Sequence, residues 1–388
     1  MNYKKLFPMF KFNKEIVYLD NAALTFKPYE VIDEGNDFYA KYSISTRTAD
    51  SVLGIAIAKK LQEARQVVAS LVDSKPHNVT FTSGTTESLN IIISMLAKII
   101  DDGEILLSYL NHDSNSIPFF ENFKGKENIK FVFATDNKDL LSKINKNTKI
   151  IALSQATNNF TMDYNLDEIY QKAKENGAIV VNDAAQAIAH EKVSLNNCDV
   201  IAFSANKIYG PTGSGALVIK DDLLKILMPT RWGGGQAQTI NGCVWTAKTN
   251  NLILEVGTPN FAGIFQLKKA IEFLNKIDYD EIDRIETKLA NYLYKKLQSV
   301  PNIKIESKKG AKIVLFNIGS YSSQDVASYL GHKNVYVRAG GFCAHMVQQL
   351  PEYNKTYVRI SLSFYNDKKD IDTIVELLKN GGNFLEFI

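Results

Sequence analysis

Short apolar runs alternate with helix-like segments between about residues 79 and 219. Most runs are apolar throughout, as in parallel strands buried on both faces. They lie at 79–82, 104–108, 129–133, 149–153, 178–182, 200–203 and 216–219. Between them, segments such as 89–100 and 166–173 place apolar residues three and four apart, which is typical of amphipathic helices. This alternation predicts βαβ units and a mostly parallel sheet flanked by helices.

The second half of the chain has a different pattern. Three consecutive glycines, 233–235, precede one long helix expected over 261–299. Beyond it, strand-like pieces at 312–316 and 335–338 mix with further helices, which predicts a smaller α+β domain. The expected fold is therefore α/β, with a large sheet domain and a smaller C-terminal one. We expect three parts: an N-terminal segment packing on the small domain (1–19), the large domain (20–262) and the small domain (263–388).

Composition fits a soluble globular protein and excludes several other classes. The 388 residues are 45% hydrophobic and 22% charged, which is enough apolar material for a packed core and excludes disorder as the main state. Forty-five Lys and Arg against 42 Asp and Glu leave a net charge of +3, so neither nucleic acid nor a membrane surface is an expected partner. The most apolar stretch, 90–100, is too short to cross a bilayer. With no recognisable targeting segment in 1–12, the expected location is cytoplasmic.

Cysteine is scarce, which limits the chemistry that it can support. Cys198, Cys243 and Cys343 are too few and too scattered for a disulfide framework or a metal site, and no metal is expected. Cys198 and Cys243 match no functional pattern and are expected to be structural. His345, two residues after Cys343, is expected to be a surface or packing residue, with tuning of the thiol as the alternative.

Polar residues follow several of the predicted strands. Small residues at 83–87 come just before a helix, where free backbone N–H groups make an anion site, although an ordinary helix cap fits them equally well. Asp183 follows the strand at 178–182. Its carboxylate fits two roles, a partner for a protonated ring nitrogen and a cap of the next helix. Lys207 follows the strand at 200–203, where burial would lower the pKa of its amine and suit it to Schiff-base formation. A phosphate site, a carboxylate and a buried lysine together indicate pyridoxal phosphate.

Ordered motifs then carry a family resemblance over nearly the whole chain. They are YLDNAA at 18–23, FTSGTTE at 81–87, NDAAQA at 182–187, the Lys207 segment, GTPN at 257–260, VRAGGFCAH at 337–345 and RISL at 359–362. With these motifs the sequence resembles the class V, fold-type I pyridoxal-phosphate enzymes, and among them the cysteine desulfurases of the Suf-type group. The resemblance implies a fold-type I transferase fold, pyridoxal 5'-phosphate as cofactor and a homodimer.

The resemblance also implies site residues. Lys207 matches the Schiff-base lysine, Asp183 the partner of the pyridine nitrogen, and Gln186 the donor to the phenolic oxygen of the cofactor. His112 matches the histidine that stacks on the ring. The residues implied to bind the phosphate are Thr85, Ser204 and Asn206. Thr258 is implied to reach the phosphate of the neighbouring subunit's cofactor.

For the substrate, Asn158 and Arg359 match residues that hold its carboxylate, and Arg47 falls near the family's substrate segment. Cys343 matches the sulfur-accepting nucleophile. The implied reaction converts L-cysteine to L-alanine and leaves a persulfide on Cys343, which passes to an acceptor protein in iron–sulfur cluster assembly or another sulfur-transfer pathway.

Three positions depart from the Suf-type pattern. Asn111 stands where the family often has Glu, Asn206 where it often has His, and Gly341-Phe342 where it has two histidines. Other class V enzymes thus stay open as alternatives: an aminotransferase, a selenocysteine lyase, a C–S lyase or an epimerase. A non-catalytic homologue is a further alternative, which the presence of Lys207, Asp183 and Arg359 disfavours.

Overall fold

The computed structural model describes residues 2–45, 51–248, 251–380 and 384–385. Its main feature is a seven-stranded sheet in which every strand expected from the apolar runs is present within one residue at either end. In spatial order the strands are β2 (Val79–Thr82), β8 (Gly215–Ile219), β7 (Val200–Ser204), β6 (Ile179–Asp183), β5 (Thr148–Ser154), β3 (Gly103–Ser108) and β4 (Ile129–Ala134). Only β8 runs against its neighbours in this sheet. The predicted α/β fold with a mostly parallel sheet is confirmed.

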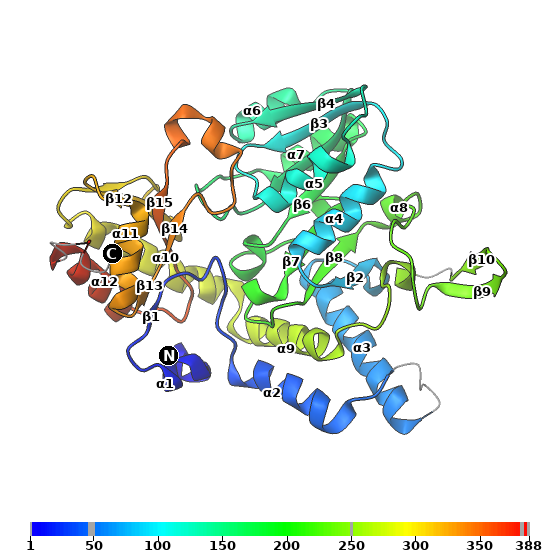
Figure 1. The fold of residues 1–388 in the computed structure, drawn as a ribbon, viewed down its shortest axis with the longest axis horizontal. Helices are drawn as coiled ribbons and strands as arrows, with labels where there is room; N and C mark the ends of the chain where they lie inside the picture. Colours follow the sequence, from blue (N-terminus) through cyan, green and yellow to red (C-terminus); the bar gives the residue numbers. More distant parts are fainter. Residues whose placement is uncertain (1, 46–50, 249–250, 381–383, 386–388) are drawn as a thin grey trace.

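Both faces of the large sheet are covered, which explains why its strands are apolar throughout. Ile151 and Leu153 of β5 face a core shared with helices α3 (Val52–Leu71) and α9 (Phe261–Ile277). Their neighbours Ile150 and Ala152 face the opposite core, shared with α4 (Thr85–Leu96) and α5 (Ile117–Asn122). Successive side chains of a strand point to opposite faces, so both sets must be apolar here. Figure 1 shows these helices on the two sides of the sheet.

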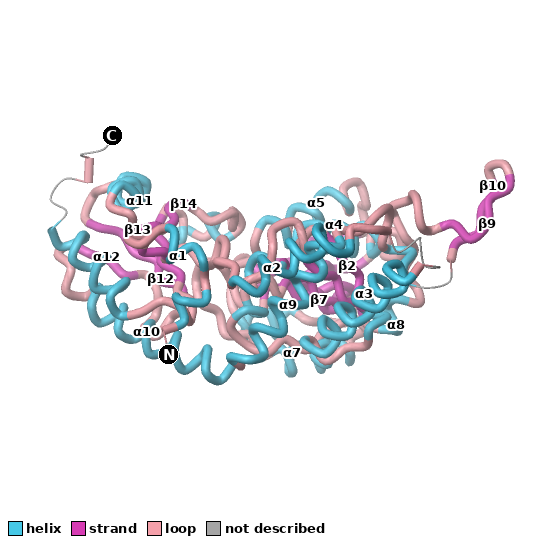
Figure 2. Tube along the Cα trace, turned by 90° about the horizontal axis from the view of Figure 1, so that it is seen from below, coloured by secondary structure: helices cyan, strands magenta, loops and turns pink. Residues whose placement is uncertain are grey.

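A second, smaller sheet lies toward the C-terminal half of the chain. Its order is β11 (Ile303–Ile305), β12 (Ile313–Ile318), β15 (Tyr357–Ser361) and β14 (Arg338–Gly340), all antiparallel. Helices α10 (Tyr279–Leu297), α11 (Ser323–His332) and α12 (Lys368–Asn380) share its core. Figures 1 and 2 show this unit beside the large sheet. The domain boundaries given above stay a prediction.

The N-terminal segment contacts both units. Strand β1 (Val17–Tyr18) pairs in parallel with β13 (Val335–Tyr336) next to the small sheet. Upstream, the buried ring of Phe7 lies 4.7 Å from that of Tyr365 and 6.2 Å from that of Tyr209, centroid to centroid. The start of the chain therefore joins the segments that carry the two sheets.

The single long helix predicted over 261–299 is wrong in one respect. The structure has two helices, α9 and α10, separated at Asp278. Asp278 has φ +66° and ψ 159°, which is not helical, and its carboxylate accepts the Glu281 N–H as the cap of α10. The apolar spacing runs on through the break, so periodicity alone did not reveal it.

The other elements complete the chain. The helices are α1 (Pro8–Phe12), α2 (Tyr29–Asp37), α6 (Asn137–Lys143), α7 (Leu166–Glu175) and α8 (Asp221–Leu224). Strands β9 (Ala237–Asn241) and β10 (Val244–Ala247) form a hairpin that projects from one end of the molecule (Figures 1 and 2). Among the described residues, no helix combines the length and apolarity needed to span a membrane.

Candidate active site

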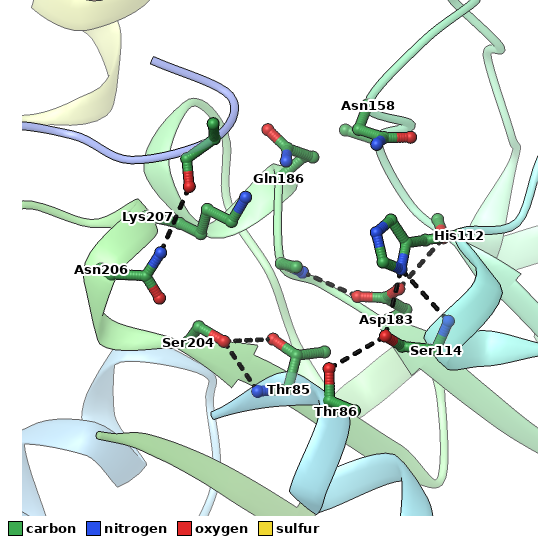
Figure 3. Close-up of a pocket in the computed structure, with 14 residues that line it drawn as sticks. Thr85, Thr86, His112, Ser114, Asn158, Asp183, Gln186, Ser204, Asn206 and Lys207 are labelled. Carbon is green, nitrogen blue, oxygen red and sulfur yellow. Dashed lines mark hydrogen bonds between the residues drawn. The ribbon is translucent and has the colours of Figure 1, made fainter. Parts of the chain in front are cut away.

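A cavity lies where the neighbouring strands β5, β6 and β7 end. Their last residues are Ser154, Asp183 and Ser204, and Ser154 is directly paired with Asp183 in the sheet. This is the edge at which open α/β sheets bind ligands. The cavity is lined by Ala23, Thr85, Thr86, His112, Ser114, Ser154, Ala156, Asn158, Asp183, Ala185, Gln186, Ser204, Asn206 and Lys207. Figure 3 shows how these side chains converge from different elements.

The floor of the cavity includes the N-terminus of α4. Its N-cap, Gly84, offers no side-chain cap, and instead the Ser204 hydroxyl accepts the Thr85 N–H at 2.7 Å and lies 2.8 Å from the Thr85 hydroxyl. Gly84 has φ +151°, and a Cβ there would lie 2.9 Å from Ser204 Oγ. This close approach needs glycine. Two hydroxyl groups and a helix N-terminus thus form a site suited to an anion.

Asp183 is a buried carboxylate held by neutral donors. It accepts hydrogen bonds from the Ala185 N–H at 3.0 Å and from the Ser154 hydroxyl at 3.3 Å. Burial raises the pKa of Asp183 because it disfavours the charged form. A cation bound beside it would supply the counter-charge that these donors lack.

Lys207 enters the cavity from the turn after β7. Its amine donates to the Ala22 carbonyl, and burial lowers the pKa of Lys207 to about 8, with the nearby Arg359 as the next cause. In Figure 3 the Lys207 side chain extends toward Gln186. The Gln186 amide also donates to the Ala22 carbonyl, at 2.8 Å, and the Asn206 amide donates to the Ala23 carbonyl at 3.3 Å.

His112 lies across the cavity from Lys207 (Figure 3). Its Nδ1 accepts the Ser114 N–H at 3.1 Å, so the neutral ring carries its proton on Nε2. Burial lowers the pKa of His112, which favours this neutral ring. A flat, neutral imidazole in this place can cover the face of an aromatic ligand.

Arg359 reaches the site from β15 of the small sheet and is only 2% exposed. Its Nη2 donates to Asp20 Oδ1 at 2.7 Å and its Nη1 to the Asn158 carbonyl at 2.9 Å. Within the described part of the chain, Arg359 Nε and Asn158 Oδ1 have no hydrogen-bond partner although both are buried. A buried donor of this kind is costly unless a ligand completes it.

Cys343 is exposed in the segment between β14 and β15, which leans from the small sheet toward the large one (Figure 1). It does not line the cavity, but its carbonyl accepts the N–H of Asp113, the residue after His112, at 2.7 Å. The preceding carbonyl, of Phe342, accepts the Asn158 amide at 2.7 Å. The thiol-bearing segment is thus attached to two loops of the cavity rim.

Among the predicted site residues that the structure describes, Thr258, Arg359 and Cys343 do not line this cavity. Thr258 is exposed in the bend before α9, outside the cavity lining. Arg47 lies outside the described residues. Of the other cysteines, Cys198 is buried as expected, but Cys243 is exposed between β9 and β10 and has no packing role in the core.

Sequence reasoning missed several contributors. Ser154 could have been found, because it is a polar residue at the end of an apolar strand like Asp183 and Ser204. Asp20 lies in the YLDNAA motif, but its pairing with Arg359 was not predicted, and neither was that of Asp113 with Cys343, because these partners lie hundreds of residues away.

Known proteins resemble this chain over nearly its full length. Residues 17–374 match the aminotransferase class-V family. A probable cysteine desulfurase from Ureaplasma parvum is 33% identical, with 97% of this chain and 96% of the relative covered. The cysteine desulfurase of Wigglesworthia glossinidia brevipalpis is 31% identical, with 96% and 94% covered.

Solved structures agree with these relatives. The apo cysteine desulfurase from Thermococcus onnurineus has a TM-score of 0.91 at 28% identity, with 97% of this chain and 96% of that chain covered. The cysteine desulfurase CsdA from Escherichia coli, solved as an S-sulfonic acid, has a TM-score of 0.88 at 27% identity, with 96% of each chain covered.

Proposed function

The chain belongs to the aminotransferase class-V family, and from this premise we propose that it is a cysteine desulfurase that uses Cys343 as its sulfur acceptor. Full-length similarity to cysteine desulfurases supports the activity. The observation that carries the assignment is the attachment of the Cys343 segment to the rim of the cavity, through the carbonyls of Cys343 and Phe342. An aminotransferase or epimerase needs no thiol at this place.

The residues of the cavity fit the cofactor, pyridoxal phosphate. The N-terminus of α4, with Thr85 and Ser204, suits the phosphate, and Asn206 lines the same cavity. Asp183 suits a protonated ring nitrogen, because its buried carboxylate has only neutral donors. When bound, the cofactor supplies a carbonyl group for an amine and a ring that accepts electrons.

The remaining contacts of the cofactor follow from the same geometry. His112 would cover the ring and Gln186 would donate to the phenolic oxygen. Lys207 would form the covalent link, because burial keeps part of its amine neutral, and only a neutral amine attacks a carbonyl.

The substrate carboxylate would bind the unpaired donor of Arg359. Arg359 Nε is a buried donor without a partner among the described residues, and its guanidinium is held in place by Asp20 and by the Asn158 carbonyl. A guanidinium binds the two oxygens of a carboxylate well. Arg47 is a further candidate for this role. With the carboxylate fixed, the amine of L-cysteine would take the place of Lys207 on the cofactor, and the freed Lys207 amine would remove the proton at Cα as a general base.

Sulfur transfer requires the thiolate of Cys343. The thiolate attacks the sulfur atom of the bound cysteine, and an S–S bond forms as the C–S bond breaks. The electron pair of the C–S bond stays with the substrate carbon, and Lys207 returns protons so that L-alanine leaves. The enzyme keeps a persulfide on Cys343.

Exposed residues of the single chain support a homodimer, and the proposed reaction implies an acceptor protein. The hairpin exposes the apolar side chains of Ile240, Val244 and Trp245, and Trp232 just before it is also exposed, which supports a homodimer that covers them. Thr258, exposed and outside its own cavity, would reach the phosphate in the neighbouring subunit. The persulfide would pass to a cytoplasmic acceptor protein, for iron–sulfur cluster assembly or another sulfur-transfer pathway.

The decisive experiment follows alanine and sulfide formation from L-cysteine with a reductant, in the wild type and in Cys343→Ala. We expect the variant to lose turnover, and mass spectrometry to find one added sulfur atom on Cys343 of the wild type. Cys243→Ala is the matched control, because Cys243 is also exposed but lies on the hairpin. Unchanged turnover in Cys343→Ala would remove its role, and no desulfuration by the wild type would refute the function.

A further inference from the structure

Residues 341–345, named here the cysteine loop, are fastened to one residue of the large domain's cavity rim, Asp113. The Asp113 N–H donates to the Cys343 carbonyl at 2.7 Å. In return, Asp113 Oδ1 accepts the His345 N–H at 3.0 Å, and Asp113 Oδ2 accepts the His345 ring Nδ1–H at 2.6 Å. Three hydrogen bonds from a single residue therefore hold the two positions on either side of Ala344.

A second attachment lies on the other side of the thiol. The Asn158 amide donates to the Phe342 carbonyl at 2.7 Å, and the ring of Phe342 lies 4.8 Å from the guanidinium carbon of Arg359. The cysteine loop is thus fixed before and after Cys343. Asp113 and Asn158 come from the loops that also position cavity residues, since Asp113 directly follows His112.

The backbone of the cysteine loop needs such support. Phe342 has φ +59° and Cys343 has φ +54°, two consecutive left-handed residues that both carry a Cβ. This conformation is unfavourable for residues other than glycine and persists where surrounding contacts enforce it. The bonds to Asp113 act on the carbonyl of Cys343 and on the N–H two residues later, so they enforce the turn directly.

From these contacts we propose that Asp113 and His345 are positioning residues, which clamp the cysteine loop to the cavity rim so that the Cys343 thiol is held within reach of the substrate for sulfur abstraction. The inference rests on the proposed role of Cys343. Nucleophilic attack needs the reacting atoms about 3–3.5 Å apart, so a loop that departs from the rim loses rate even when the substrate is bound. Transfer of the sulfur to an acceptor has the opposite requirement, because the persulfide must then leave the cavity. The clamp therefore favours the first half of the reaction over the second.

The clamp can be tested without any assay of activity. Hydrogen exchange in the holoenzyme, read on the peptide that covers the cysteine loop, reports the bonded His345 N–H. We expect Asp113→Ala to speed exchange there about ten- to a hundredfold, as expected for losing hydrogen bonds to a carboxylate. Asp113→Asn keeps one acceptor oxygen and should give a smaller change. His77→Ala is the matched control, because His77 forms an equally short pair, 2.6 Å, with Asp221 on the surface.

A kinetic split separates positioning from a general structural defect. In Asp113→Ala and His345→Ala we expect the first-turnover rate of alanine formation to fall while the KM for L-cysteine stays unchanged. Transfer of a preformed persulfide to dithiothreitol should be as fast as in the wild type or faster. Unchanged exchange at the cysteine loop, or equal slowing of both halves, would overturn the proposal. If no variant and not even the wild type forms alanine, the proposed function fails, and the exchange measurement still decides whether the clamp exists.

Discussion

Lys207 should titrate near neutral pH before the cofactor is bound. Burial lowers the pKa of Lys207 from 10.5 to about 8, so its charged form is disfavoured by about 3 kcal/mol relative to an exposed lysine. At pH 7.5 about a quarter of the Lys207 amine is neutral, whereas about one in a thousand ordinary lysines is. This difference is what makes the residue ready to capture a carbonyl group.

The perturbation is Arg359→Met, which removes the cation that contributes to the shift after burial itself. We expect the pKa of Lys207 to rise by about half to one pH unit but to stay below 10.5, since burial remains. Lys27 is the internal control, because burial also lowers its pKa to about 8 but Arg359 is not among the causes.

The assay is competitive acetylation of the cofactor-free protein over a range of pH, with the peptides of Lys207 and Lys27 quantified by mass spectrometry. In the wild type both lysines should label with midpoints near pH 8, and in Arg359→Met only the midpoint of Lys207 should rise. A Lys207 midpoint near 10.5, or an equal shift of both lysines, would contradict the reasoning.

The same pKa has a consequence for stability. The folded-state pKa of Lys207 lies below the unfolded value, so the folded protein binds fewer protons between pH 8 and 10.5. The cost of burying the ammonium is therefore present below pH 8 and disappears as the pH rises toward 10.5. The contribution of Lys207 to the free energy of unfolding of the cofactor-free enzyme should increase over this window.

Three further substitutions test the packing by urea denaturation, with the midpoint as readout and an unchanged m-value as the check for two-state unfolding. Glu286→Gln removes the charge of a fully buried carboxylate 3.3 Å from Lys312 Nζ, which keeps Asp283 at 3.0 Å, and should cost about 1.5–3 kcal/mol. Glu255→Ala leaves the buried Arg65 without its two-bond partner, at 2.7 and 2.9 Å, and should cost about 3 kcal/mol. Phe7→Ala empties the center of an aromatic cluster and should cost about 3–5 kcal/mol. A loss below about 1 kcal/mol in any of the three would contradict the corresponding burial argument.

The strands of the large sheet were predictable because helices cover both of its faces. A run such as Ile150–Leu153 is apolar at every position because both faces of the strand are buried, and polar residues mark its ends. The direction of β8 was not predictable, because a strand buried on both faces has the same pattern whichever way it runs. The break at Asp278 was hidden for a similar reason, since α9 and α10 bury apolar residues on both sides of it.

The candidate site was predictable where it depends on strand ends. Thr85, Asp183, Ser204 and Lys207 each follow a strand or begin the next helix, and parallel strands bring such positions to one edge. The contact between Asp113 and His345 joins residues 232 positions apart and belongs to no repeating pattern. Only the fold brings these two loops together.

The departures from the Suf-type pattern lie in residues that support the site. The Asn111 amide donates to the Ala152 carbonyl at 2.9 Å, and its oxygen accepts the Ser154 N–H at 3.1 Å. A glutamate in its ionised form has no donor and would leave the Ala152 carbonyl without this bond. Asn111 therefore ties the turn before His112 to the strand end that also contacts Asp183.

The same reasoning applies to Phe342. Its buried ring lies over the guanidinium of Arg359, where a histidine would place two ring nitrogens that need partners, and a protonated ring would repel the arginine. Phe342 instead supports Arg359 through its ring and binds Asn158 through its carbonyl. Lys207, Asp183 and Cys343, the residues proposed to react or to hold the cofactor, match the pattern. The chain thus keeps the three residues of the family pattern, and the Asp113–His345 clamp is the part of the thiol's fastening that a single substitution can release.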